Sequence, residues 1–270
     1  GDVTGRIKCT IAGWTGVVYK IPRTELDNSK ERSHLKQSGV YFLFGTSDQT
    51  GESMVYIGQA GARKNGEGIL NRLLEHRRNP DKDYWIEAVA ITTTDDTFGP
   101  TEISYLENRF CNLAVDAKRY TVKNNNDPTQ GHITEEKESE LESFIDYTKI
   151  ILGTLGYKIF VPFVESETEI YKPGYDIAPE PILLLNNKKA NARGKRTSDG
   201  FVVFKGSQIA LAPTPSCPDT IKRLREKHQS KIDKNGILLE DILFSSPSAS
   251  AGFAMYASAN GNILWFTEDG

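Results

Sequence analysis

Apolar residues in the first half of the chain recur with two different periods, and together they predict a mixture of strands and helices. Residues 6–21 alternate around the turn Gly13-Trp14-Thr15-Gly16, which is typical of a β-hairpin. The remaining runs predict a short helix over 26–37, strands over 40–44, 54–58 and 85–92, and helices over 68–78, 101–118 and 134–155. Within the strand 40–44, even-numbered residues face one way and odd-numbered residues the other. Because strands and helices are mixed without a regular βαβ alternation, the pattern predicts an α+β fold.

Residues that favour helix ends support these limits. Thr101 and Thr134 each precede an apolar stripe with helical spacing, and either side chain can accept a hydrogen bond from the first turn. Pro80 and Gly156 mark the ends of two helices.

The C-terminal part has patterns of its own. Residues 164–197 combine prolines with a basic tract and predict a linker. A strand over 201–204, a basic helix over 220–230, a helix that begins at Ser245 or Ser246, and a strand over 263–266 predict a small α+β module. The predicted organisation is an N-terminal hairpin extension (1–38), a core domain with a trailing helix (39–163), a linker (164–197) and an accessory domain (198–270).

Composition places the chain among ordinary globular proteins. Hydrophobic residues make up 38% and charged residues 26% of the 270 residues. No run approaches the ~20 apolar residues that a membrane span needs, and the start shows no signal-peptide pattern. Cys9, Cys111 and Cys217 are far apart and odd in number, which disfavours a zinc site or a disulfide framework. We therefore expect a protein of the reducing cytoplasm without membrane partners.

Charge is distributed unevenly along the chain. The net charge is −3, but residues 134–180 hold 11 acidic and 4 basic side chains, whereas residues 186–235 hold 12 basic and 4 acidic ones. Binding of a polyanion depends on the charge of the local surface and not on the net charge of the chain. The basic C-terminal part is therefore a candidate for contacts with nucleic acid. A solvated surface beside a flexible linker explains the same charges equally well.

The candidate chemistry begins with two tyrosines on the predicted strands 40–44 and 54–58. Tyr41 and Tyr56 can point at one surface, and Gly58 leaves room for a close approach. Either tyrosine alone is an ordinary strand residue.

Two helices add charged groups. Arg72 and His76 are four residues apart on the flank of a helix, where arginine can clamp a phosphate and histidine can move a proton. Glu107 lies at the border of an apolar stripe, where a carboxylate is costly to bury unless a cation meets it. A metal ion could meet it, and a salt bridge to a core arginine is the alternative.

The order of these groups resembles the GIY-YIG nuclease family. The resemblance covers residues 39–130 and rests on four segments, which are Gly39-Val40-Tyr41, Tyr56-Ile57-Gly58, the helix Gly68–His76, and Tyr105-Leu106-Glu107-Asn108-Arg109. It implies a metal-dependent endonuclease that hydrolyses phosphodiester bonds of nucleic acid, with DNA as the expected substrate and Mg²⁺ or Mn²⁺ as the cofactor.

The resemblance also implies roles for individual residues. Tyr41 would orient or deprotonate the attacking water, and Tyr56 would support it. Arg72 would stabilise the transition state, and His76 would assist proton movement. Glu107 would hold the metal ion, and Asn124 or Asn126 would steady the site.

Gln59 stands where some family members carry a lysine, so Arg63 or Lys64 would have to supply that cation, or the role is absent.

The C-terminal part, with Gly200–Ser207, Phe244–Ala249 and Ala259-Asn260-Gly261, resembles a small domain of unknown function that is often appended to such modules in prokaryotes. Two further hypotheses stay open. One is a nucleic-acid-binding module in a defence or repair assembly that does not cleave, which the balance of 13 basic and 14 acidic groups in residues 30–130 favours. The other is an adaptor whose C-terminal module binds protein.

Overall fold

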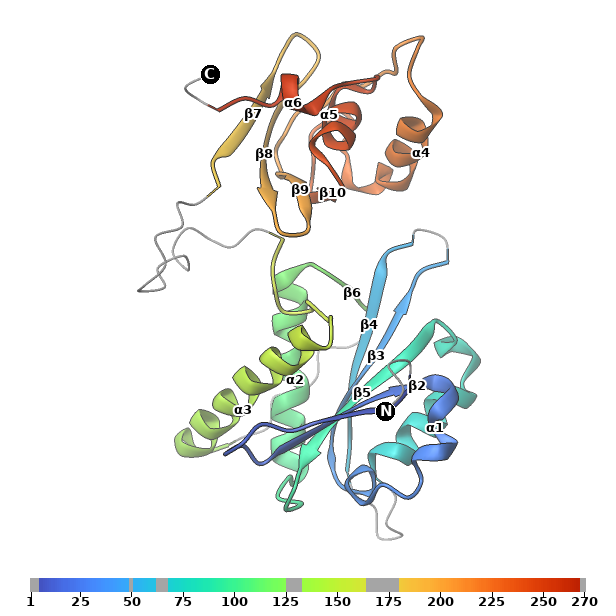
Figure 1. The fold of residues 1–270 in the computed structure, drawn as a ribbon, viewed down its shortest axis with the longest axis vertical. Helices are drawn as coiled ribbons and strands as arrows, with labels where there is room; N and C mark the ends of the chain where they lie inside the picture. Colours follow the sequence, from blue (N-terminus) through green and yellow to red (C-terminus); the bar gives the residue numbers. More distant parts are fainter. Residues whose placement is uncertain (1–4, 49–50, 62–67, 125–132, 164–179, 268–270) are drawn as a thin grey trace. The chain divides into compact units, whose positions relative to one another are not determined.

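A computed structural model describes residues 5–48, 51–61, 68–124, 133–163 and 180–267. It divides into two compact units, Gly1–Pro162 and Phe163–Gly270 (Figure 1). Each unit combines one sheet with helices, which confirms the predicted α+β class. Within the described residues, none of the helices has both the length and the apolar character needed to cross a membrane.

The first unit is built on a six-stranded sheet with the order β1-β2-β5-β3-β4-β6. Its strands are β1 (Ile7–Cys9), β2 (Gly16–Pro22), β3 (Gly39–Thr46), β4 (Ser53–Ala60), β5 (Trp85–Thr93) and β6 (Thr121–Val122). Neighbours are antiparallel except β4 and β6, which are parallel. The three strands expected from the sequence form the centre of this sheet.

The predicted N-terminal hairpin extends this same sheet, which therefore has more than the three strands expected. β2 pairs with β5 over its whole length, from Gly16 opposite Thr93 to Pro22 opposite Glu87. Consecutive residues Val17 and Val18 are both fully buried, one on each face. A strand that is apolar on both faces is stable only inside a sheet that is covered on both sides.

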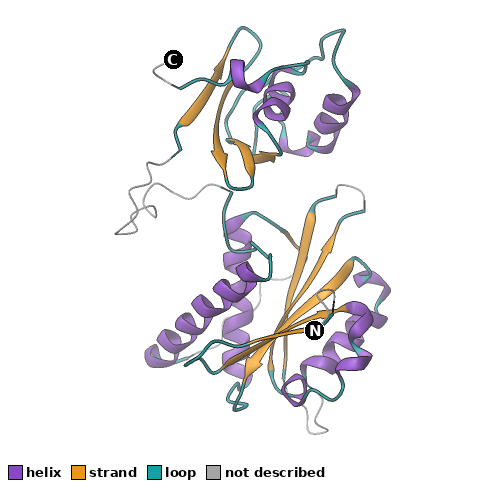
Figure 2. Ribbon diagram, viewed as in Figure 1, coloured by secondary structure: helices purple, strands orange, loops and turns teal. Residues whose placement is uncertain are grey.

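Three helices cover the sheet: α1 (Ile69–Arg78), α2 (Pro100–Ala117) and α3 (Glu135–Thr154) (Figure 2). Phe42 and Phe44 of β3 join a cluster with Phe110 of α2 and Ile145 of α3 on one face. On the other face, Leu43 packs with residues of α1. The alternation predicted for residues 40–44 is thus confirmed.

Two details of the helices differ from expectation. The segment 26–37 forms two short 3₁₀ turns, η2 (Asp27–Ser29) and η3 (Ser33–Lys36), and no α-helix, and a further 3₁₀ turn, η1 (Arg23–Glu25), precedes it. α2 begins before Thr101, with Gly99 as its N-cap and Pro100 in its first turn, where a proline's missing N–H costs nothing. Thr134 caps α3 as predicted, because its side chain accepts a hydrogen bond from the Lys137 amide.

The second unit contains a four-stranded antiparallel sheet with the order β10-β9-β8-β7. Its elements are β7 (Ile182–Asn186), β8 (Asn191–Thr197), β9 (Gly200–Val203), α4 (Asp219–Lys227), η6 (Gln229–Lys231), β10 (Ile242–Phe244), α5 (Pro247–Met255) and α6 (Gly261–Leu264). Ser246 caps α5, as the sequence predicted. The predicted strand over 263–266 is wrong, because Asn260 caps a helical turn there and only Phe266 pairs with β7.

The second unit also corrects the predicted linker. Residues 182–197, which we expected to lie in a linker over 164–197, form β7 and β8. Leu183, Leu185 and Ala192 alternate with less buried residues and pack into the core of the unit. The basic residues around them hid this alternation, so the prolines and lysines dominated the prediction.

Candidate active site

Tyr41 and Tyr56 lie on neighbouring strands and on one face of the first sheet. Tyr41 pairs with Gly58 across β3 and β4, and its ring centroid lies 6.3 Å from that of Tyr56. A Cβ atom on Gly58 would lie 2.3 Å from the hydroxyl oxygen of Tyr41 and 2.9 Å from Cε1 of Tyr56. Only glycine fits at this position, since real Cβ atoms do not approach other atoms so closely. Gly58 therefore makes the close placement of both tyrosines possible.

His76 anchors Tyr41 from α1. The hydroxyl of Tyr41 lies 2.6 Å from Nε2 of His76, and both side chains are buried. Burial, followed by the positive charges of Lys82 and Arg72, lowers the pKa of His76 to about 3. Burial also raises the pKa of Tyr41 far above its usual value. At neutral pH both groups are therefore uncharged, and when the imidazole carries its hydrogen on Nδ1 the phenol donates the hydrogen bond to Nε2.

Arg72 lies one helical turn before His76, as its i, i+4 spacing predicts. Its Nη1 atom lies 2.7 Å from Oε2 of Glu75, and this hydrogen bond is the main reason why its pKa is raised above the usual value. Arg72 also interacts with Tyr41, through a hydrogen bond and through its charge, and that contact opposes the rise in the tyrosine's pKa. The guanidinium is thus a permanent cation beside the two tyrosines.

Glu107 reaches the same site from α2. It is half-buried, and Gln59 Nε2 donates a hydrogen bond of 2.9 Å to its Oε2 atom. Burial raises the pKa of this carboxyl, while the bonds from Gln59 and the charges of Arg72 and Lys82 oppose the rise. Within the described part of the chain Glu107 forms no ion pair, so the alternative of a salt bridge to a core arginine does not hold.

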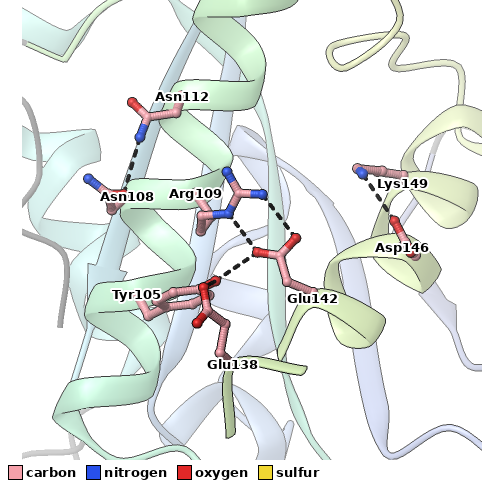
Figure 3. Close-up of polar contacts among 8 residues, drawn as sticks. All are labelled: Tyr105, Asn108, Arg109, Asn112, Glu138, Glu142, Asp146 and Lys149. Atoms are coloured by element: carbon pink, nitrogen blue, oxygen red, sulfur yellow. Dashed lines mark hydrogen bonds and ion pairs between the residues drawn. The ribbon is translucent and has the colours of Figure 1, made fainter. Parts of the chain in front are cut away.

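A polar network joins α2 to α3 (Figure 3). Arg109 donates two hydrogen bonds to Glu142, of 2.6 Å from Nε and 2.9 Å from Nη2. The hydroxyl of Tyr105 donates to Glu142 and Glu138, at 2.8 Å and 3.1 Å. Residues two positions apart are separated by about 200° around a helix, so Glu107 projects away from both Tyr105 and Arg109. Clamping that flank to α3 fixes the side of α2 from which Glu107 meets Gln59 of β4.

Asn124 braces the strand that carries Tyr56. Its side chain accepts a hydrogen bond of 3.1 Å from the Ile57 amide and donates one of 2.7 Å to the Ile57 carbonyl. The side-chain amide of Asn124 thus pairs with the backbone of Ile57 at the edge of β4, as a residue of a neighbouring strand would. It holds the backbone between Tyr56 and Gly58. The steadying role expected of Asn124 or Asn126 stays a prediction, and Asn126 lies outside the described residues.

Lys82 is a member of this site that the sequence did not point to. It ends the 3₁₀ turn η4 (Pro80–Lys82) between α1 and β5, and its Nζ atom lies 3.2 Å from the centroid of the Tyr56 ring. Burial and the charge of Arg72 lower its pKa to about 8, and Glu107 opposes this. The cation expected from Arg63 or Lys64, which lie outside the described residues, is thus available from a different segment.

The donor set fits a metal that is held by few protein ligands. Among the described residues there is no group of three His, Cys, Asp or Glu side chains that could enclose a metal ion. Mg²⁺ keeps several waters and is often held by one or two carboxylates together with substrate phosphates. Glu107, half-buried and without an ionic partner among the described residues, is suited to be that single carboxylate.

Comparison with known proteins identifies only the C-terminal part. Residues 183–270 match a family model described as a domain of unknown function, DUF4357. No curated protein and no solved structure matches the chain. The match confirms the expected C-terminal domain and begins within β7, in agreement with the strand that replaces part of the predicted linker. It does not extend to the residues of the candidate site.

Proposed function

We propose that the first unit is a metal-dependent endonuclease that hydrolyses phosphodiester bonds of nucleic acid, with DNA as its substrate. The convergence of two tyrosines, a neutral histidine, two cations and one carboxylate carries this proposal. Apart from Lys82, it is also the set of groups that the resemblance to GIY-YIG nucleases implies.

Tyr41 and His76 would carry the proton transfers of hydrolysis. With the imidazole hydrogen on Nδ1, Tyr41 donates its own hydrogen to His76, and the lone pairs of its oxygen are left to accept a proton from the attacking water. As the water oxygen bonds to phosphorus, its proton passes to Tyr41 while the phenolic proton passes to Nε2 of His76. The leaving alkoxide then takes a proton from solvent. Because the protonated imidazole is disfavoured in its buried setting, it returns its proton to Tyr41 as the tyrosine gives up the proton taken from water to solvent, which balances the proton that the alkoxide took.

The charged residues hold the phosphate. Arg72 and Lys82 supply positive charge near Tyr56, where charge would build on the phosphoryl oxygens. Some members of the family carry a lysine at the position of Gln59, and here Lys82 would supply that positive charge. A divalent metal bound through Glu107 would neutralise further charge on the phosphate.

Cleavage assays test this proposal directly. Supercoiled plasmid, linear duplex, single-stranded DNA and RNA are incubated with the full chain in Mg²⁺, in Mn²⁺ or in EDTA. Glu107→Gln should lower the cleavage rate by roughly 100-fold or more and leave the unfolding midpoint unchanged. Asp116→Asn, an exposed carboxylate on the same helix, is the matched control. Full activity of Glu107→Gln would refute the metal role.

A binding module that does not cleave is the second candidate. The balanced charge of residues 30–130 favours it, because nucleases that hold duplex DNA tightly usually present excess positive charge. A mobility shift with every metal and no nicked product on any substrate would favour this reading over hydrolysis.

A further inference from the structure

The sheet of the second unit has one face that its helices cover and one that they do not. Phe201 and Val203 of β9 pack with Phe253 of α5 and with Trp265 on the inner face. Figure 2 shows α4 and α5 gathered on one side of this sheet. Among the described residues, the hydrophobic cluster of this unit contains no side chain from the alternate positions, which form the outer face, and of these Val202 alone is fully buried.

One cross-strand row on the outer face carries two aromatic rings and an arginine. Leu184 of β7 pairs with Arg193 of β8 and, on its other side, forms a bridge with Phe266. Beyond Arg193 lies Phe204, whose amide donates a hydrogen bond of 2.8 Å to the Arg193 carbonyl. Paired residues of antiparallel strands point to the same face, so these four side chains form one row. Phe266 is 38% exposed, Phe204 is partly exposed and Arg193 is exposed.

The neighbouring row carries one lysine among aliphatic side chains and no aromatic ring. Lys195 of β8 pairs with Ile182 of β7 on one side and with Val202 of β9 on the other, and Leu243 of β10 completes the row. Arg193 and Lys195 are two residues apart and therefore lie about 7 Å from each other on the same face. The outer face thus combines adjacent cations with apolar and aromatic neighbours.

The charges of this face are available to a partner. Within the described part of the chain, neither Arg193 nor Lys195 forms an ion pair. Residues 183–270 hold twelve basic and eight acidic side chains, whereas the whole chain has a net charge of −3. A polyanion is the partner whose charge complements this surface.

We propose that the outer face of the second sheet binds a single strand of nucleic acid. Arg193 and Lys195 would contact successive phosphates, and bases would stack on Phe204 and Phe266 at the two ends of the first row. Flat sheet faces with exposed aromatic rings suit unpaired bases, because a duplex hides the base faces that the rings need. This surface is separate from the tyrosine site, and the proposal does not depend on cleavage.

Fluorescence anisotropy of the full chain tests this surface. Labelled single-stranded DNA and RNA of mixed sequence, and the matching duplex, are titrated in EDTA. The double variant Arg193→Ala/Lys195→Ala should weaken single-strand binding by about tenfold or more and reduce the magnitude of the salt slope by about 1.4. Phe204→Leu and Phe266→Leu, which keep apolar bulk, should each weaken it by about tenfold. The matched control is Arg223→Ala/Lys227→Ala, which removes two exposed cations from α4.

Each result decides the proposal. Loss of affinity in the sheet variants, with near-normal binding by the control, supports it. The relative affinity for DNA and RNA then identifies which strand is bound. The proposal is overturned if the wild-type chain binds neither single strand, if it prefers duplex, or if the control variant loses as much affinity as the sheet variant. Retained affinity in both phenylalanine variants would overturn base stacking as the mode of binding.

Discussion

The two sheets of this protein use their faces differently. In the first unit, consecutive residues Phe42 and Leu43 are both fully buried, so helices and turns cover the sheet on both sides. In the second unit, Phe201 is fully buried on the inner face, whereas Arg193 on the outer face is exposed. Burial on both faces of the first sheet shifts the pKa values of its polar side chains and fixes their positions, which suits a reaction at a single bond. The outer face of the second sheet leaves charged and aromatic side chains accessible, which suits binding of an extended strand of nucleic acid.

Alanine substitution of apolar residues on each face tests whether both faces of the first sheet and only one face of the second are covered. These variants have the largest expected effects on stability. Phe42→Ala and Leu43→Ala, on opposite faces of β3, should each lower the free energy of unfolding by about 2–5 kcal/mol. Phe201→Ala on the inner face of β9 should cost about 3–5 kcal/mol. Leu184→Ala on the outer face of β7 should cost less than about 1 kcal/mol, because its side chain is already partly exposed.

Denaturant unfolding followed by circular dichroism measures these differences, and separate transitions for the two units would assign each loss to its own core. The contrast fails if Leu184→Ala proves as costly as Phe201→Ala, because something would then cover the outer face.

Much of the fold could be predicted from local patterns. The central strands and the three long helices of the first unit follow from apolar periodicity, since long periodic segments specify their own class. The predictions failed where tertiary contacts decide. Polar residues 26–37 form 3₁₀ turns, and the basic tract at 188–196 lies in and beside β8. In the first segment the composition suggested an α-helix, and in the second it suggested a linker. Tertiary packing determined a different conformation in each.

The sequence pointed to most residues of the candidate site, but not to Lys82 and not to the protonation states of the others. Order along the chain pointed to Tyr41 and Glu107, but a spacing of four on a helix could not show that His76 is buried with a lowered pKa. Lys82 gave no signal at all, because lysine in an Asn-Pro-Asp-Lys turn is typical of a surface. Asn79 accepts a hydrogen bond from the Asp81 amide and shapes this turn. Only the resulting path of the chain brings the amine onto Tyr56.

Gly58 offers the next sharpest test, because the first sheet tolerates no extra atom between its tyrosines. Gly58→Ala should destabilise the first unit by about 1–3 kcal/mol, since the new methyl group would overlap the Tyr41 hydroxyl. It should also lower cleavage strongly by displacing Tyr41 from His76. Gly61→Ala is the control, because its Cβ would meet nothing closer than Ile103 Cδ1 at 4.0 Å. Equal behaviour of the two variants in thermal unfolding would show that the tyrosines are not so tightly placed.

The smallest predicted effect concerns the buried amine of the first site and depends on the proposed hydrolysis. The pKa of Lys82 is lowered to about 8, so the side chain is a cation below that pH and becomes neutral as pH rises through it. If the charge binds phosphate, kcat/KM of the wild-type chain should fall above about pH 8, by up to tenfold per pH unit.

Lys82→Arg should keep its charge over this range, because arginine is not deprotonated in proteins, and its profile should stay flatter. Lys36→Arg, an exchange at an exposed position, controls for the substitution itself. Rates are measured from pH 6.5 to 9.5 at constant ionic strength, with KM and kcat separated. The expected difference lies in KM, since Lys82 holds substrate and moves no proton. Identical profiles for wild type and Lys82→Arg would exclude this amine as the phosphate contact and leave that role to Arg72.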